Sequence, residues 1–193
     1  ANQPQQYTER RLLAQKKAVE VVHRARVERT RAIMSQAQQE VGELTARDLF
    51  LLGTALYWAE GSKQKPHDVS ASVIFSNSDP RAITLILVWL RLVCGVTLHD
   101  LTFDLYLHET AQASNAKQFW SDQLNLPIER FLIRWKRHKV GTRRKNIGDS
   151  YHGLIRVRVR RSTNLNRRIE GWIVGIVESL GSGVRVTHRA LDP

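Results

Sequence analysis

Cysteine is almost absent from this chain, whose 193 residues include one, Cys94. A lone cysteine excludes a disulfide framework and a zinc cluster, and it fits a reducing compartment. Long apolar runs are also lacking, because the longest, residues 82–93, contains Thr84 and Arg91 and is too short to cross a bilayer. Residues 1–6 are polar and have no signal-peptide pattern. We therefore expect a cytoplasmic protein with no membrane partner.

Acidic residues are scarce in one segment of the chain. Residues 130–168 contain 14 Lys and Arg against a single acid, Asp149, whereas the other 154 residues carry 16 basic and 17 acidic residues. The whole net charge of +12 therefore comes from this segment. Such concentrated positive charge indicates a polyanionic partner, nucleic acid first. The sequence contains no recognisable Ser-His-Asp triad, phosphate-binding loop or zinc-ligand spacing.

Residues 7–43 contain no proline and one glycine, Gly42, which predicts a long N-terminal helix. Its first two-thirds are basic, through Arg10, Arg11, Lys16, Lys17, Arg24, Arg26, Arg29 and Arg31. Three interpretations stay open: a solvated helix held by i,i+4 pairs, a basic arm along phosphates, or a weak coiled-coil dimer element. We expect a basic helical arm over residues 1–44, the main domain over 45–180 and a poorly ordered tail over 181–193.

Apolar and polar residues alternate in four segments, residues 69–77, 101–109, 131–138 and 153–161. This period is typical of strands with one buried face. Helical patterns occupy residues 45–60, 80–94, 114–125 and 164–181, and Asp79 before Pro80 predicts the start of one of them. We therefore predict an α+β fold, in which a half-open antiparallel sheet is covered by helices on one face and open on the other.

The predicted open face is basic. Period two brings Arg156, Arg158 and Arg160 to one side of their strand, and Arg134, Lys136 and His138 to one side of another. The connection between these strands adds Arg143, Arg144 and Lys145. Closely spaced cations on a bare sheet repel one another unless an anion covers them. Because a β-ribbon fits the major groove and arginine matches the guanine edge, we predict that these residues bind DNA.

The first helix of the main domain ends unusually. It is apolar over most of its length and then presents one carboxylate, Glu60, before Gly61, a residue suited to a left-handed helix C-terminus. Gly53, Ala55 and Ala59 are small, which would let another helix approach closely. A carboxylate buried in such a contact is costly unless it is paired or bound to a metal. The helix therefore indicates a close helix contact with an acid at its end.

Residues 53–61 resemble the LAGLIDADG motif of homing endonucleases, with Glu60 at the metal-binding acid and Gly61 at the closing glycine. Ala55 and Ala59 stand at its small positions. The departures from the motif are Gly53 for leucine, Ala55 for glycine, Trp58 for the first acid and glutamate for aspartate. Residues 75–80, 107–109, 119–120, 144–148, 151–153 and 160–162 also resemble small bacterial single-motif LAGLIDADG-like proteins, and the likeness extends over residues 43–180.

The resemblance implies a homodimeric endonuclease that cuts both strands of duplex DNA at a specific, near-palindromic site. The motif helices would cross at the twofold axis through Gly53, Ala55, Leu56 and Ala59. Glu60, together with Gly61, would hold Mg²⁺ or Mn²⁺ against the scissile phosphate. The auxiliary catalytic candidates are Lys63, Lys136, Asp104 and His108. The implied setting is a bacterial or phage-like cytoplasm, in association with the nucleoid.

Two alternatives share this fold. LAGLIDADG folds also occur as DNA-binding transcriptional regulators that do not cleave and have lost the acid. Retention of Glu60 favours cleavage, whereas the longer glutamate side chain and the bulky Trp58 beside it favour the regulator. An RNA-binding splicing factor on the same fold also fits the composition.

Overall fold

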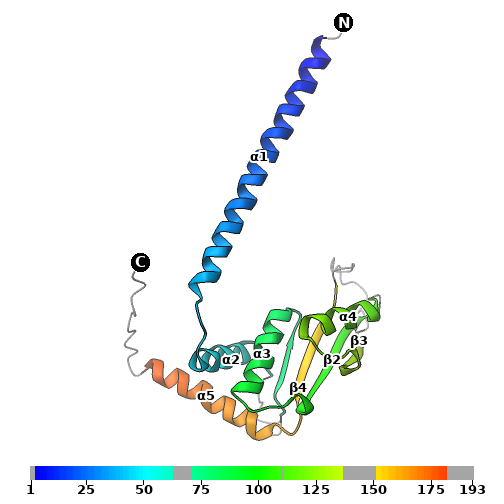
Figure 1. Ribbon diagram of the computed structural model, residues 1–193. Helices are drawn as coiled ribbons and strands as arrows, with labels where there is room; N and C mark the ends of the chain where they lie inside the picture. Colours follow the sequence, from blue (N-terminus) through cyan, green and yellow to red (C-terminus); the bar gives the residue numbers. More distant parts are fainter. Residues whose placement is uncertain (1–2, 63–70, 110, 137–150, 182–193) are drawn as a thin grey trace. The chain divides into compact units, whose positions relative to one another are not determined.

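The computed structural model describes residues 3–62, 71–109, 111–136 and 151–181, with side chains from Arg10 onward (Figure 1). The chain divides into two compact units, Ala1–Thr45 and Ala46–Pro193. The tail predicted over residues 181–193 lies outside the described residues, apart from Gly181.

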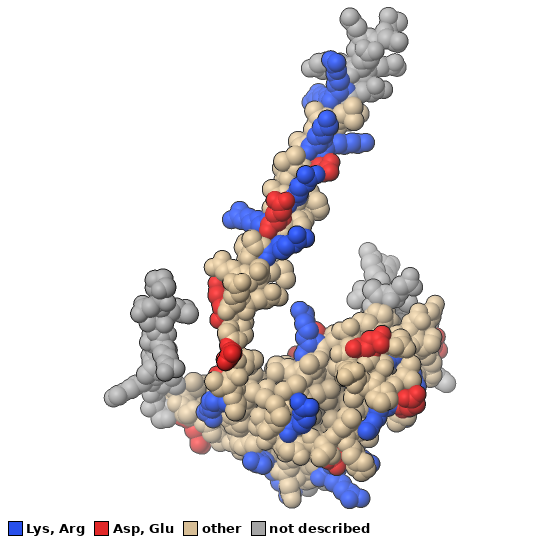
Figure 2. Space-filling view, viewed as in Figure 1, with Lys and Arg blue, Asp and Glu red and all other residues tan. Residues whose placement is uncertain are grey.

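The described part of the first unit is dominated by one helix, α1 (Gln3–Glu40), which is 38 residues long. Its described side chains are all exposed, apolar ones such as Leu12 and Ile33 included. Arg24 and Glu20 form an i,i+4 ion pair of 3.4 Å, with side chains 70% and 69% exposed, and pairs this exposed stabilise a helix only slightly. Basic side chains recur along α1 with acidic ones among them (Figure 2). The predicted long basic helix is confirmed.

The described part of the second unit consists of helices and a four-stranded sheet. The helices are α2 (Ala46–Glu60), α3 (Pro80–Leu92), α4 (Ala113–Leu124) and α5 (Thr163–Gly181). The strands are β1 (Ile74–Asn77), β2 (Leu101–His108), β3 (Phe131–Lys136) and β4 (Leu154–Val159). Short 3₁₀ turns, η1 (Leu98–Asp100) and η2 (Ile128–Arg130), precede β2 and β3. The predicted α+β class is confirmed.

The sheet has the strand order β1-β4-β2-β3 and is mixed. β4 is antiparallel to both β1 and β2, whereas β3 is parallel to β2, with Phe131 opposite Phe103. The prediction of a purely antiparallel sheet is therefore wrong at this one pair. The reason is the connection, because α4 carries the chain back along the sheet and β3 then starts at the same end as β2.

The described helices cover one face of the sheet and leave the other open (Figure 1). The covered face supplies the core through alternate strand residues, which are Phe75, Phe103, Leu105, Leu107, Phe131, Ile155, Val157 and Val159. From the helices, α3 adds the fully buried Trp89 and α5 adds Ile169. Trp89 stacks on Tyr57 of α2 and meets Trp172 of α5 edge-on, with ring centroids 6.0 and 6.1 Å apart. These aromatic contacts join the three helices.

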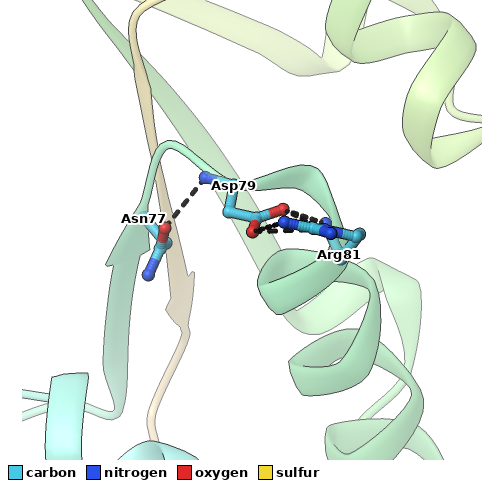
Figure 3. A network of polar contacts seen from close by, with 3 residues as sticks. All are labelled: Asn77, Asp79 and Arg81. Carbon is cyan, nitrogen blue, oxygen red and sulfur yellow. Dashed lines mark hydrogen bonds and ion pairs between the residues drawn. The ribbon is translucent and has the colours of Figure 1, made fainter. Parts of the chain in front are cut away.

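Helix α3 begins where the sequence predicts. Asp79 is its N-cap, because the Asp79 carboxylate accepts a hydrogen bond from the Arg81 backbone N–H at 2.9 Å, and Pro80 occupies the first turn. The Arg81 guanidinium donates to both oxygens of the same carboxylate, and the Asp79 N–H donates to the Asn77 side chain (Figure 3). The hydrogen bonds from the Arg81 side chain and backbone hold the pKa of Asp79 below its usual range.

Among the described residues, no helix is both long enough and apolar enough to cross a membrane.

Candidate nucleic-acid interface and the end of helix α2

The sheet surface that the described helices do not cover is called the open face below. Its side chains are Ile74 and Ser76 of β1, Thr102, Asp104, Tyr106 and His108 of β2, Leu132, Arg134 and Lys136 of β3, and Leu154, Arg156 and Arg158 of β4. Ser76 pairs with Arg156, Arg156 with Asp104, and Asp104 with Leu132, so one row of side chains crosses all four strands. The structure thus brings Arg134, Lys136, Arg156 and Arg158 onto one surface.

Asp104 is the carboxylate on this part of the sheet. Its oxygen Oδ1 accepts a hydrogen bond from Nε of Arg134 at 2.8 Å. The Asp104 side chain is only 11% exposed, whereas that of Arg134 is 56% exposed. This hydrogen bond raises the pKa of Arg134. Asp104 is therefore already paired with a cation, and the strands otherwise leave three basic side chains unneutralised on the open face.

Tyr106 lies between cations from the two neighbouring strands. Its hydroxyl accepts a hydrogen bond from the Arg156 guanidinium at 2.7 Å, and the centre of that guanidinium lies 4.6 Å from the ring centroid. The Lys136 ammonium lies 5.2 Å from the same centroid. Arg156 also donates from Nε to the hydroxyl of Ser76 at 3.3 Å. These roles of Tyr106 and Ser76 were not predictable from the sequence, because they depend on strand register.

Arg158 and Arg160 differ although they lie two residues apart. Arg158 is exposed in β4, opposite Thr102 and Ile74. Arg160 lies beyond the last residue of β4, and its guanidinium donates to the backbone carbonyl of His99 in η1. Two of the three predicted arginines therefore lie within β4, and Arg160 follows directly after it, so its place on the open face stays a prediction. Of the other predicted contacts, Lys63, His138, Arg143, Arg144 and Lys145 lie outside the described residues.

Glu60 is the exposed last residue of α2. Its carboxylate stands at the negative end of the helix dipole, a place where a nearby cation is favourable. After Glu60 the chain turns into the sheet edge, since Gly61 bridges to Phe75 and the Ser62 N–H donates to the Ile74 carbonyl at 2.9 Å. The end of α2 therefore lies beside β1.

Gly61 is not the left-handed residue that was predicted. The positive-φ glycines of the described residues are Gly42, Gly95 and Gly153. Gly61 is needed instead for close packing, because a Cβ there would lie 2.4 Å from the Tyr57 carbonyl oxygen. Its N–H donates to that same carbonyl at 2.7 Å, which closes the last turn of α2.

Gly53 faces the interior of the subunit, which contradicts its predicted place in a dimer interface. It is buried, and a Cβ there would lie 2.1 Å from two ring atoms of Trp89. Leu56 is half-buried and packs against the same core. Ala55 and Ala59 are exposed, as an interface would require.

Two large apolar side chains extend the exposed surface of Ala55 and Ala59. Leu52 is 44% and Trp58 is 43% exposed. Residues 52, 55 and 59 lie within one helical face, with residue 58 at its border. The exposed face of α2 is therefore made of Leu52, Ala55, Trp58 and Ala59.

No group of three or more His, Cys, Asp or Glu side chains in the described part of the chain could hold a metal ion. Asp104 is paired with Arg134, and His108 stacks on Tyr151 with ring centroids 5.6 Å apart. Glu60 therefore stands as the exposed carboxylate at the end of α2, and within the described residues it belongs to no group of three such side chains.

Comparisons with family models, with curated proteins and with solved structures found nothing that matches this chain.

Proposed function

We propose that this protein is a homodimeric DNA-binding protein of the LAGLIDADG endonuclease type, with duplex DNA lying on the open face. One observation carries the proposal: the open face gathers Arg134, Lys136, Arg156 and Arg158, while its carboxylate is already paired. A polyanion that covers such a surface gains from every unneutralised cation and releases its own counterions. The proposed setting is a bacterial or phage-like cytoplasm, in association with the nucleoid.

The contacts of Tyr106 favour a duplex over a single strand. Proteins that bind single strands stack exposed bases on free aromatic rings. Tyr106 is the Phe, Tyr or Trp side chain that the described strands direct to the open face, and its ring is occupied by Arg156 and Lys136. Among the strand residues of the open face, cations without a free aromatic ring suit phosphates and base edges. This argues against the RNA-binding alternative.

The exposed face of α2 is the proposed contact between two copies. Ala55 and Ala59 allow close approach of a second helix, and Leu52 and Trp58 provide apolar area at its sides. Because α2 ends beside β1, the edge strand, a twofold contact through α2 would bring the two β1 edges toward each other. The two open faces would then form one longer surface.

The hydrolytic part of the proposal depends on this dimer. Mg²⁺ or Mn²⁺ requires several oxygen ligands, and the described residues of one subunit contain no group of three or more His, Cys, Asp or Glu side chains that could supply them. A second copy would add a second Glu60. Strand cleavage therefore stays a prediction of the resemblance, with the two Glu60 carboxylates as the proposed metal ligands.

The non-cleaving DNA-binding regulator is the second candidate. It is favoured by the same lack of a metal-binding group within the described part of one subunit. It shares the open face and the α2 contact with the first candidate, so the two differ only in whether Glu60 has a chemical role.

Cleavage is tested with supercoiled plasmid, in Mg²⁺ or Mn²⁺ and in EDTA. The nuclease requires metal-dependent nicks or cuts that Glu60→Gln abolishes. The matched control is Glu40→Gln, since Glu40 is also the exposed last residue of its helix but lies in α1. DNA binding without cleavage, unchanged in Glu60→Gln, assigns the regulator.

Binding is tested by fluorescence anisotropy on a random-sequence duplex over a salt series. Arg158→Ala is expected to weaken binding and to reduce the slope of log K against log salt by about 1. Arg91→Ala is the control, because Arg91 is an exposed arginine on α3, on the covered side of the sheet. Equal effects of the two variants would contradict binding through the open face.

The dimer is tested by sedimentation velocity. Ala55→Glu and Ala59→Glu place charge on the exposed face of α2 and are expected to give monomers, whereas Ser114→Glu on α4 leaves the mass unchanged. A monomeric wild-type protein at working concentration would remove the paired Glu60 site.

A further inference from the structure

The three arginines that β3 and β4 direct to the open face differ in which of their guanidinium nitrogens are already hydrogen-bonded. Arg134 uses Nε to bond Asp104, so neither of its two terminal nitrogens is engaged by that bond. Arg156 uses Nε for Ser76 and one terminal nitrogen for Tyr106. Arg158 is exposed, and its side chain has no hydrogen bond or ion pair to another described residue.

Bidentate recognition of guanine by arginine needs two unengaged N–H donors, and where Nε is already bonded these must be the two terminal nitrogens. They donate together to O6 and N7 at the edge of the base in the major groove. Arg156 has lost one of these donors to Tyr106, so it is suited to a single contact, such as a phosphate oxygen. Arg158 has both donors but no contact that fixes its direction. Arg134 alone of the three combines a free pair of donors with a fixed guanidinium.

Asp104 gives independent support, because an acid on a phosphate-binding surface has a cost. It weakens attraction to DNA of any sequence, so non-specific binding does not account for it. The Asp104 side chain is 11% exposed and the Arg134 side chain is 56% exposed, so the carboxylate lies beneath the guanidinium that it holds. A carboxylate bonded to Nε orients the guanidinium plane and leaves its outer edge available.

We propose that Arg134 determines specificity by reading one guanine in each half of the DNA site, and that Asp104 is the positioning residue that aims it. This inference rests on the proposed DNA binding and adds to it the base that is recognised. Arg156 and Lys136, held against Tyr106, serve the phosphates beside that base.

The test is selection of binding sites from a randomised duplex pool, with wild-type protein, Asp104→Asn, Arg134→Lys and Arg91→Ala. Wild type and Arg91→Ala are expected to enrich guanine at one position in each half-site. Arg134→Lys and Asp104→Asn are expected to reduce this preference about tenfold, the usual worth of a good bidentate contact. Asp104→Asn is also expected to bind the unselected pool more tightly at low salt, because the surface loses its acid.

A second measurement needs no Asp104 variant, in case that substitution impairs folding. The selected guanine is replaced by 7-deazaguanine, which lacks the N7 acceptor. Wild-type affinity is expected to fall about tenfold, whereas the affinity of Arg134→Lys is expected to change little. Circular dichroism melting of each variant shows that the compared proteins are folded.

The outcomes separate the inference from the function on which it rests. If wild type binds no duplex, the proposed function and the inference both fail. If wild type binds duplexes without base preference, or if guanine preference survives in Arg134→Lys, DNA binding stands and the role of Arg134 is refuted. If Asp104→Asn binds the pool more tightly and keeps full guanine preference, Asp104 is not the positioning residue.

Discussion

Substitution of Gly53 by alanine tests whether this residue belongs to the core or to a subunit contact. Gly53 lies in α2, and a Cβ there would lie 2.1 Å from Cγ and Cδ1 of Trp89 and 2.7 Å from its Cβ. Trp89 is fully buried and cannot move aside easily, because it stacks on Tyr57 and meets Trp172 edge-on. An added methyl group therefore overpacks the centre of the helix layer.

The magnitude follows from two opposing effects. Glycine to alanine inside a helix stabilises by about 1 kcal/mol. Overpacking a filled core costs about 1–3 kcal/mol, and a separation of 2.1 Å belongs at the upper end of that range. The net effect of Gly53→Ala is a loss of about 2 kcal/mol in the free energy of unfolding.

Gly175→Ala is the matched control, since Gly175 also lies inside a helix, α5. A Cβ at Gly175 would meet nothing within 4 Å. This variant keeps only the helical gain, so we expect it to be more stable than wild type by about 0.5–1 kcal/mol. The same chemical change therefore has opposite signs at the two positions.

Urea unfolding measured at two protein concentrations is the assay, with sedimentation velocity alongside. The core role of Gly53 predicts a lower unfolding midpoint in Gly53→Ala at both concentrations. A wild-type or higher midpoint, together with loss of dimer mass, would refute this reasoning and return Gly53 to a subunit interface.

Three further outcomes follow from buried groups. Burial raises the pKa of Tyr57 from 10.0 to about 12. The stabilisation that the neutral phenol contributes is therefore complete below pH 10 and is lost as pH rises toward 12. Urea unfolding should show the free energy of unfolding fall by about 2–3 kcal/mol across that window in wild type, and a flatter profile in Tyr57→Phe. Burial also raises the pKa of the Cys94 thiol to about 12. A disulfide reagent at pH 8 should therefore label the folded protein at least about a hundredfold more slowly than the urea-unfolded chain, and comparable rates would contradict this burial. The buried Ser162 hydroxyl accepts a hydrogen bond from the Val73 N–H at 2.8 Å and donates one to the Val159 carbonyl at 2.7 Å. Calorimetry of Ser162→Ala should show a loss of about 1–3 kcal/mol in the free energy of unfolding, and a melting curve like that of wild type would contradict this role.

The parts of the fold that depend on near neighbours in the chain were predictable. Asp79 and Pro80 predict the start of α3 because a cap acts on the next few residues. The alternation in β2 and β4 predicts the covered and open faces, since successive strand residues must point to opposite sides. Neither inference needs knowledge of which elements meet.

The parts that depend on distant neighbours were not predictable in the same way. Alternation gives the face of a strand but not its partner, so the parallel pairing of β3 with β2 is absent from the pattern. Gly53, Ala55 and Ala59 are equally small, and α2 is apolar on several sides, so the sequence does not indicate which of them faces inward. The position of Trp89, in another helix, decides that Gly53 does.

The candidate site also combines features that the sequence predicts with features that depend on distant residues, and Asp104 illustrates both. The alternation of β2 directs Asp104 to the open face, where it was considered for a role in hydrolysis. The parallel register places Tyr106 opposite Arg134, and the bond from Arg134 then reaches diagonally to Asp104. That bond occupies Oδ1 of a side chain that is only 11% exposed, so we assign Asp104 to holding Arg134 rather than a metal. We therefore expect any hydrolysis to depend on Glu60, whereas Asp104 is the proposed positioning residue for recognition.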